Sequence, residues 1–167
     1  GTGLRLGLSA RGAAIHMGEY HLTVPFYPPG SLTFGILVNR HGQRFIAEDG
    51  YHGRIAEMAS RQPMGSVYLI VDEASFGRPL HEGFEIAAVE ENLADLERAL
   101  SLPLNSLQRT VALYNHNAEK REDPGLHKQP AWLRPITQSP FAAIDCSFGN
   151  APYMAFSLGG LWTRSTG

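Results

Sequence analysis

Four side chains between positions 41 and 52 carry atoms that bind metal ions or transfer protons: His41, Glu48, Asp49 and His52. A zinc site of two histidines on one helix face needs the H-E-x-x-H spacing, which these residues do not have. The sequence also offers no pair of cysteines to complete such a site. We therefore interpret the four residues as polar surface groups around a turn and predict no metal centre.

Cys146 is the one cysteine of the sequence. A nucleophilic thiolate needs a neighbouring cation that lowers its pKa, and the adjacent residues are Asp145 and Ser147. We therefore predict a buried structural thiol. A single cysteine cannot form an internal disulfide, which favours a reducing compartment such as the cytoplasm. The G-x-S-x-G nucleophile elbow is absent, although the order of residues alone leaves a Ser-His-Asp triad open.

The sequence opens with Gly1, Thr2 and Gly3, a G-x-G pattern. Such a pattern can direct backbone N–H groups at a phosphate, but on this evidence alone a simple helix start is favoured. The longer dinucleotide pattern G-x-G-x-x-G does not occur, and neither does the phosphate-binding pattern G-x-x-x-x-G-K-[ST]. These routes therefore give the chain no dinucleotide site of its own.

Aromatic residues are concentrated in the last third of the chain. They are Trp132, Phe141, Phe148, Tyr153, Phe156 and Trp162. Such rings pack a core, and they also form the wall of an apolar pocket for a flat ligand. The two interpretations do not exclude each other.

Composition excludes several classes of protein. The 167 residues carry a net charge of −2, so no basic stripe is available for nucleic acid. The longest apolar runs, residues 36–38 and 68–71, are far shorter than the ~18 residues of a membrane span. Charged residues make up 18%, below the ~25% usual in soluble domains, which suits a domain covered by a partner. The chain has 18 glycines and 11 prolines, which indicate many turns but not disorder.

Hydrophobic periodicity predicts how these residues are positioned. Helices are expected over residues 4–15, 51–62, 89–100 and 104–114. Strands are expected over residues 21–26, 34–39, 43–46, 67–71, 142–146 and 153–157. Residues 39–42 form a turn with Gly42 at the position of positive φ, and residues 121–130 form a polar loop. Because strands and helices do not alternate regularly, we predict an α+β fold with a mostly antiparallel sheet.

Residues 35–49, GILVNRHGQRFIAED, resemble the G-I-L-V-N-x-x-G-x-R-F-x-x-E signature of the fumarate reductase/succinate dehydrogenase flavoprotein superfamily. Further stretches match in the same order: residues 1–7, 68–72, 107–115, 140–144 and 158–161. The resemblance implies the substrate-capping domain that this superfamily inserts into an FAD-binding fold. It assigns residues 1–26 to the end of the FAD-binding domain and crossover, 27–150 to the cap and 151–167 to a truncated return strand.

The resemblance also implies FAD in the full-length enzyme. It places Gly1, Thr2, Gly3, Gly159 and Gly160 next to that cofactor. Both ends of the chain look cut, since the dinucleotide fold before the cap and the closing region after it are missing. We therefore expect the 167 residues alone to turn over no substrate and to retain little FAD. The FAD-binding domain of the same polypeptide is the implied partner, and the face it would cover is expected to favour an artificial homodimer.

Within the superfamily, the sequence is most similar to the 3-ketosteroid dehydrogenases of the Δ4-(5α) type. These enzymes place a tyrosine shortly after the R-F-x-x-E signature, and Tyr51 stands there, with Arg54 one helical turn away. In the family's reaction a hydride is transferred to FAD, and a proton leaves the neighbouring carbon. The resemblance implies that the tyrosine accepts this proton directly or passes it on through a hydroxyl relay. Phe156, with Tyr153 and Phe34, would then cover a flat apolar substrate such as a ketosteroid.

Two other functions stay open. A fumarate reductase-like enzyme that reduces a dicarboxylate would use Arg54 and Arg78 as cationic donors. Fumarate reductases share an H-T-M-G-G segment, but residues 156–160 read FSLGG, with Phe156 where the histidine would stand. A ligand-binding module without enzymatic activity is the second alternative.

Overall fold

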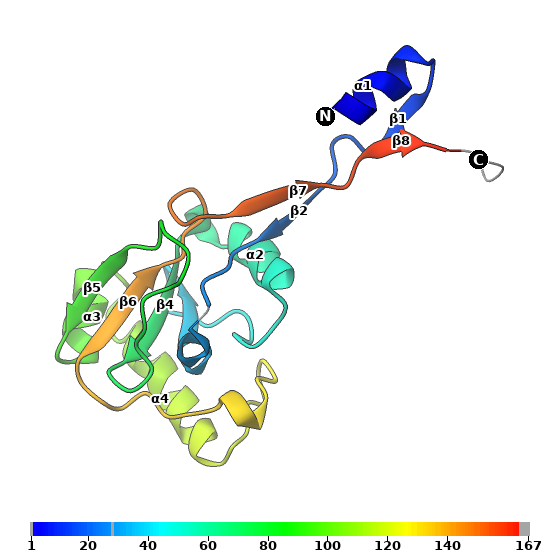
Figure 1. The fold of residues 1–167 in the computed structure, drawn as a ribbon. Coiled ribbons are helices and arrows are strands. Elements are labelled where there is room, and N and C mark those ends of the chain that lie inside the picture. The colour runs from blue at the N-terminus through cyan, green and yellow to red at the C-terminus, as the bar shows by residue number, and fades with distance from the viewer. Residues whose placement is uncertain (1, 28, 164–167) are drawn as a thin grey trace. The chain divides into compact units, whose positions relative to one another are not determined.

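A four-stranded antiparallel sheet organises residues 23–153 of the computed structural model, which describes residues 2–27 and 29–163. Its order is β3 (Ile36–Asn39), β4 (Val67–Asp72), β6 (Phe141–Asp145) and β5 (Ile86–Glu90) (Figure 1). Every residue of β4 is buried except Tyr68, as expected of a continuous run of β-branched and aliphatic residues. We call these 131 residues, Thr23–Tyr153, the core unit.

One face of the sheet forms the main core with two helices, α3 (Leu93–Ala99) and α4 (Ser106–Glu119). Strand side chains alternate between faces, so Ile36, Val38 and Ile70 share this face. The helices contribute the apolar stripe that the sequence shows at helical spacing, namely Leu96, Leu107, Val111 and Tyr114. The opposite face is buried as well, since Leu37, Leu69 and Ile144 are at most 1% exposed.

The core unit contains one further helix, α2 (His52–Ser60), and three single turns of 3₁₀ helix. The turns are η1 (Gly30–Phe34), η2 (Pro63–Gly65) and η3 (Pro130–Trp132). The helix α2 buries Ile55, Ala56 and Ala59, the apolar face that the sequence predicts, and it ends before Pro63.

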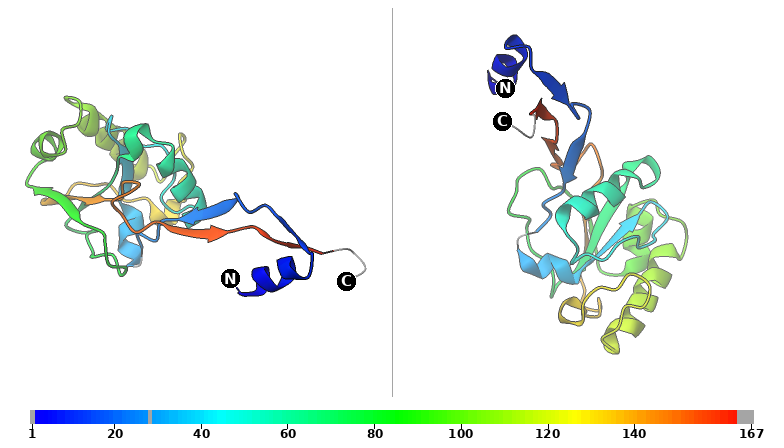
Figure 2. Two further views of the ribbon diagram at one scale, coloured as in Figure 1. Left: turned by 90° about the horizontal axis from the view of Figure 1, so that it is seen from above. Right: turned by 90° about the vertical axis from the view of Figure 1, so that its right-hand side faces the viewer.

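The remaining described residues, 2–22 and 154–163, form a second compact unit, which we call the strand-pair unit. It begins with α1 (Thr2–Ser9). Two pairs of short strands follow: β1 (Ala13–Ile15) with β8 (Gly160–Trp162), and β2 (Tyr20–Thr23) with β7 (Met154–Ser157). Each pair lies side by side in both views of Figure 2. No helix among the described residues is long and apolar enough to cross a membrane.

The structure confirms the α+β fold and the turn at residues 39–42. Gly42 has φ 68°, and its N–H donates to the Asn39 carbonyl at 2.9 Å. The expected strands over residues 67–71, 142–146 and 153–157 correspond to β4, β6 and β7, and the expected helices over 51–62 and 104–114 to α2 and α4. The predicted buried position of Cys146 is also confirmed.

Three expected elements are wrong. The helix over residues 4–15 ends at Ser9, because the Gly12 N–H turns back to the Gly7 carbonyl at 2.8 Å and the chain continues as β1. The strand over residues 43–46 is reduced to a single bridge between Val38 and Arg44, because the Gln43 N–H donates to the Asn39 side chain at 3.2 Å and not to a strand carbonyl.

The helix expected over residues 89–100 is the third error, since Val89 belongs to β5, a strand that the periodicity does not predict. Asn92 divides the two elements, because its side chain accepts the Asp95 N–H at 2.9 Å and so starts α3. The other expected strands are shorter: Phe34 lies in η1, so β3 begins at Ile36, and β2 ends at Thr23.

Candidate functional site

Tyr51 and Arg54 stand at the exposed start of α2. Tyr51 is the N-cap residue, with an extended backbone (φ −62°, ψ 132°) and a side chain that is 69% exposed. Its carbonyl accepts the Ile55 N–H at 3.0 Å, which makes it the first acceptor of the helix. Arg54 lies one turn further and is also exposed. The structure therefore places both residues on the surface of the core unit, one turn apart.

His52, between them, is held by the chain just before η1. Its Nδ1 lies 3.1 Å from the Val24 carbonyl oxygen, and its ring stacks on Tyr27 at 4.1 Å between centroids. Burial, with a smaller contribution from the charge of Asp49, raises the pKa of Tyr27. His52 is thus a structural histidine that fixes the start of α2.

Glu48, three residues before Tyr51, belongs to a buried cluster of charges, which corrects the prediction that Glu48 is a surface group. The Glu48 side chain is completely buried. Arg44 donates from Nη2 to Glu48 Oε2 at 2.8 Å and from Nε to Oε1 at 3.1 Å. The same guanidinium donates to both oxygens of Asp123, at 3.2 and 3.1 Å. Arg44 therefore joins two carboxylates that are 75 residues apart in sequence.

Lys128 completes this cluster from the loop that the sequence describes as polar. Its side chain is 0% exposed, and its Nζ lies 3.1 Å from Glu48 Oε2. The ammonium also donates to the Gly35 carbonyl at 2.7 Å. Tyr114 lies beneath both cations, with its ring centroid 4.8 Å from the Arg44 guanidinium carbon and 5.3 Å from Lys128 Nζ. We call Arg44, Glu48, Asp123 and Lys128 the charge cluster.

The charges of the cluster stabilise one another. Burial alone would raise the pKa of Glu48, but Lys128 and Arg44 outweigh it and hold that pKa below its ordinary value. Burial lowers the pKa of Lys128, and the charge of Glu48 opposes this. Hydrogen bonding and charge from Arg44 likewise overcome burial at Asp123 and lower its pKa. Among the described residues, no group of three or more acidic, histidine or cysteine side chains is placed to hold a metal ion.

Phe34 and Tyr153, the predicted substrate-binding residues of the core unit, have separate surroundings. The half-buried Phe34 ring lies 5.4 Å from Trp132, and the guanidinium carbon of Arg134 lies 4.6 Å over it. Tyr153 donates its hydroxyl to the Cys146 carbonyl at 2.9 Å and packs against Phe148. No ring contact joins Phe34 to Tyr153 in the described part of the chain. Their proposed shared role stays a prediction.

Phe156 and the predicted cofactor-binding glycines belong to the strand-pair unit. Phe156 is 54% exposed on β7. Gly159 lies so close to the backbone of His16 that a Cβ would approach the His16 carbonyl oxygen to 2.7 Å. Close packing therefore explains why a glycine stands at this position. Gly160 begins β8. Thr2 and Gly3 lie exposed in the first turn of α1, and Gly1 lies outside the described residues.

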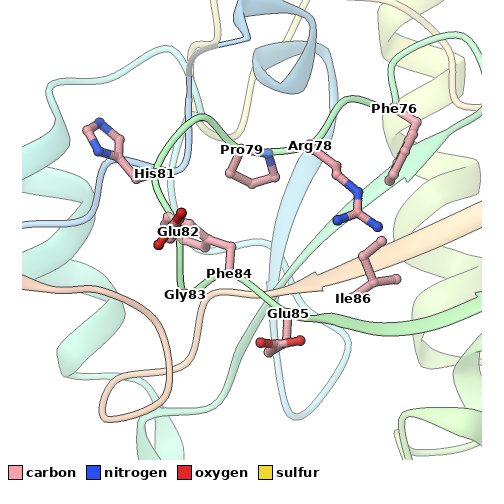
Figure 3. Close-up of a pocket in the computed structure, with 9 residues that line it drawn as sticks. All are labelled: Phe76, Arg78, Pro79, His81, Glu82, Gly83, Phe84, Glu85 and Ile86. Atoms are coloured by element: carbon pink, nitrogen blue, oxygen red, sulfur yellow. The ribbon is translucent and has the colours of Figure 1, made fainter.

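The two arginines of the dicarboxylate alternative line different hollows of the core unit. Arg78 lines a hollow of about 410 Å³ formed by residues 76–86, and Figure 3 shows its guanidinium pointing toward the space between Phe76 and Ile86. Arg54 lines another hollow of about 320 Å³, together with Met58 and Leu126. A small dicarboxylate needs converging cations, and the structure does not bring these two together.

No known protein-family profile matches the chain. A curated relative is the NADH:acrylate oxidoreductase of Vibrio harveyi, 28% identical over 96% of this chain and 17% of that protein. Among solved structures, the 3-ketosteroid-Δ4-(5α)-dehydrogenase of Rhodococcus jostii RHA1, in complex with 4-androstene-3,17-dione, has a TM-score of 0.77. It is 34% identical over 96% of this chain and 34% of that chain.

A flavocytochrome c3 fumarate reductase in its open conformation has the same fold, with a TM-score of 0.68 and 18% identity. The match covers 95% of this chain and 29% of the fumarate reductase. The present chain thus spans about a third or less of each of these three proteins. The similarity extends over nearly all of its own length.

Proposed function

We propose that this chain, which is similar in sequence and fold to part of the fumarate reductase/succinate dehydrogenase flavoproteins, is the substrate-capping part of an FAD-dependent oxidoreductase. The whole protein would dehydrogenate, or reduce, a carbon–carbon bond next to a ketone, as the name of the 3-ketosteroid-Δ4-(5α)-dehydrogenase indicates for that enzyme. The observation that supports this most strongly is its 34% identity and TM-score of 0.77 over 96% of the chain.

The described residues do not fit FAD by themselves. The space beside Gly159 is filled by the backbone of His16 and Met17, so this glycine leaves no cradle for a phosphate. The chain also has no G-x-G-x-x-G turn, the pattern that brings the backbone close to the pyrophosphate in dinucleotide folds. FAD is therefore proposed for the whole protein only, and we derive no step through it.

Tyr51 is the residue of this chain to which we assign a chemical role. Its hydroxyl would take or relay the proton that leaves the carbon next to the ketone, while Arg54 lies on the same side of the helix. The exposed N-cap position suits this role. The helix start that carries Tyr51 is held in place by His52, whose ring nitrogen lies 3.1 Å from the Val24 carbonyl oxygen. A positioned proton-transfer group contributes about 10²–10⁴-fold to a rate.

The test is Tyr51→Phe in the whole enzyme, with Tyr68→Phe as the matched control. Tyr68 lies on β4, is half-buried and packs against the main core that the sheet forms with α3 and α4. We expect the turnover of a 3-ketosteroid to fall by about 10²–10⁴-fold in the first variant and by less than about threefold in the second. A Tyr51→Phe rate within about twofold of the wild type contradicts the proton-transfer role.

Inhibitors distinguish the proposed ketosteroid dehydrogenase from the dicarboxylate reductase that would use Arg54 and Arg78. A dicarboxylate reductase would be inhibited by succinate, whereas the proposed enzyme is inhibited by flat apolar ketones. A ligand-binding module would bind such ketones and carry no flavin in the whole protein.

A further inference from the structure

We propose that Lys128 and Gln129 are positioning residues for Tyr51, acting through Glu48 and Asp49. The proposal rests on the role given above to Tyr51. It concerns a connection that the sequence does not reveal, since Gln129 and Asp49 are separated by 80 residues. The connection has two ties, one made by a side chain and one by the backbone.

The first tie joins Lys128 to Glu48. Both side chains are 0% exposed, and their charged atoms lie 3.1 Å apart. The Glu48 carboxylate also accepts the Leu37 N–H at 2.9 Å, and the ammonium donates to the Gly35 carbonyl at 2.7 Å. Lys128 and Glu48 therefore hold each other and the start of β3, Lys128 through Gly35 just before the strand and Glu48 through Leu37 within it. Glu48 precedes Tyr51 by three residues.

The second tie joins the next residues along each segment. The backbone N–H of Gln129 donates to Asp49 Oδ2 at 2.9 Å. The turn then closes with a bond from the Gly50 N–H to the Ala47 carbonyl at 3.2 Å. Only Gly50 stands between the second tie and Tyr51, so a displacement of Asp49 would move the N-cap of α2.

Charge balance explains why the loss of Lys128 should act on Glu48. The charge cluster holds two cations, Arg44 and Lys128, and two carboxylates, Glu48 and Asp123. Loss of the lysine charge leaves one buried carboxylate in excess, and a buried charge without a partner drives rearrangement. The carboxylate that loses an ion-pair partner is Glu48, because the Lys128 ammonium lies 3.1 Å from its Oε2, whereas the bonds from Arg44 to both carboxylates remain.

Amide hydrogen exchange of the 167-residue chain, measured by NMR, tests this. In Lys128→Met, we expect exchange at Leu37 and Ile55 to accelerate by at least about tenfold more than at Val111 in α4. The ring signals of Tyr51 should shift in the same variant. Lys120→Met is the matched control, because Lys120 is exposed and contacts His116 in α4. It should change neither the exchange pattern nor the Tyr51 signals.

The double variant Lys128→Met with Glu48→Gln restores charge balance. We expect it to return the exchange at Ile55 to within about threefold of the wild type and to recover the Tyr51 ring signals. Uniform acceleration at Leu37, Ile55 and Val111 in Lys128→Met, without recovery in the double variant, overturns the proposal, because it means that Lys128 stabilises the whole unit and does not position one segment.

If Lys128→Met does not fold, Asp49→Ala provides the test, since it removes the second tie without burying a charge. We expect exchange at Ile55 to accelerate about threefold while exchange at Val111 stays unchanged. No change at Ile55 overturns the proposal. This readout needs no turnover, so it is independent of the rate of Tyr51→Phe, which tests the proposed function itself.

Discussion

The core unit and the strand-pair unit differ in what stabilises them. The core unit buries aliphatic residues on both faces of its sheet, together with the balanced charges of the charge cluster. In the strand-pair unit, none of the described residues is buried, and apolar side chains such as Leu6 and Trp162 are 65% and 66% exposed. Two-stranded ribbons are marginal alone, and exposed apolar groups gathered in one unit indicate a surface for another domain.

This difference agrees with the roles proposed for the two units, the core unit as the cap and the strand-pair unit as the connection to the FAD-binding domain. The role proposed for Tyr51 requires a rigid start of α2. The segments that would lead to and from the FAD-binding domain need that domain to cover them. We expect the stability of the two units to respond differently to substitution.

The largest expected effect is on the charge cluster. Glu48→Ala leaves Lys128 buried without its carboxylate, so the free energy of unfolding of the core unit should fall by about 3–5 kcal/mol. The control is Glu57→Ala, which removes an exposed pair with Arg61 and should cost less than about 1 kcal/mol. Urea unfolding followed by circular dichroism measures both. Equal losses would mean that the cluster contributes no more than a surface pair.

A direct comparison of the two units uses one leucine from each. Leu69→Ala opens a cavity in the sheet and should cost about 2–5 kcal/mol, because Leu69 is completely buried. Leu6→Ala in α1 should cost less than about 0.5 kcal/mol. The midpoints of urea unfolding give both values. A large loss for Leu6→Ala would show that the strand-pair unit has a core of its own.

A smaller effect is expected from pH. The folded-state pKa values of Glu48 and Asp123 are lowered, so their contribution to stability is complete above their ordinary values of 4.5 and 3.8 and is lost as the pH falls through the folded values. The urea midpoint should therefore fall on acidification below about pH 4.5. In Glu48→Gln, the fall should be shallower, since this residue no longer titrates. An identical fall in both proteins would show that Glu48 does not contribute.

Local patterns predicted much of the fold. The apolar run at residues 67–71 and the leucine spacing before Tyr114 led directly to β4 and α4, because burial on a sheet or helix face leaves a period in the sequence. The strand β5 was missed because Val89 also fits the helical spacing that Leu93 and Leu96 continue. Only the cap at Asn92 separates the two elements, and a cap is a weak signal in sequence.

The candidate site could be predicted only in part. The family's signature points to Tyr51, and the structure has this residue at an exposed helix start, while its role in proton transfer stays a prediction. The burial of Glu48 and Lys128 was not predicted, because each looks like a surface residue until its partner, 80 residues away, is known. The available signal was a charged residue, Glu48, near an apolar strand. This signal does not tell which distant residue pairs with it.

The assignment of this chain as a cap is tested most directly by the flavin content of the purified 167-residue chain, read from its visible absorption spectrum and from the supernatant after denaturation. We expect no flavin band, because the described residues form no cradle for FAD, and no flavin binding on addition of FAD at micromolar concentration. A flavin released in a one-to-one ratio with the chain would contradict the assignment of this chain as a cap that depends on a separate FAD-binding domain.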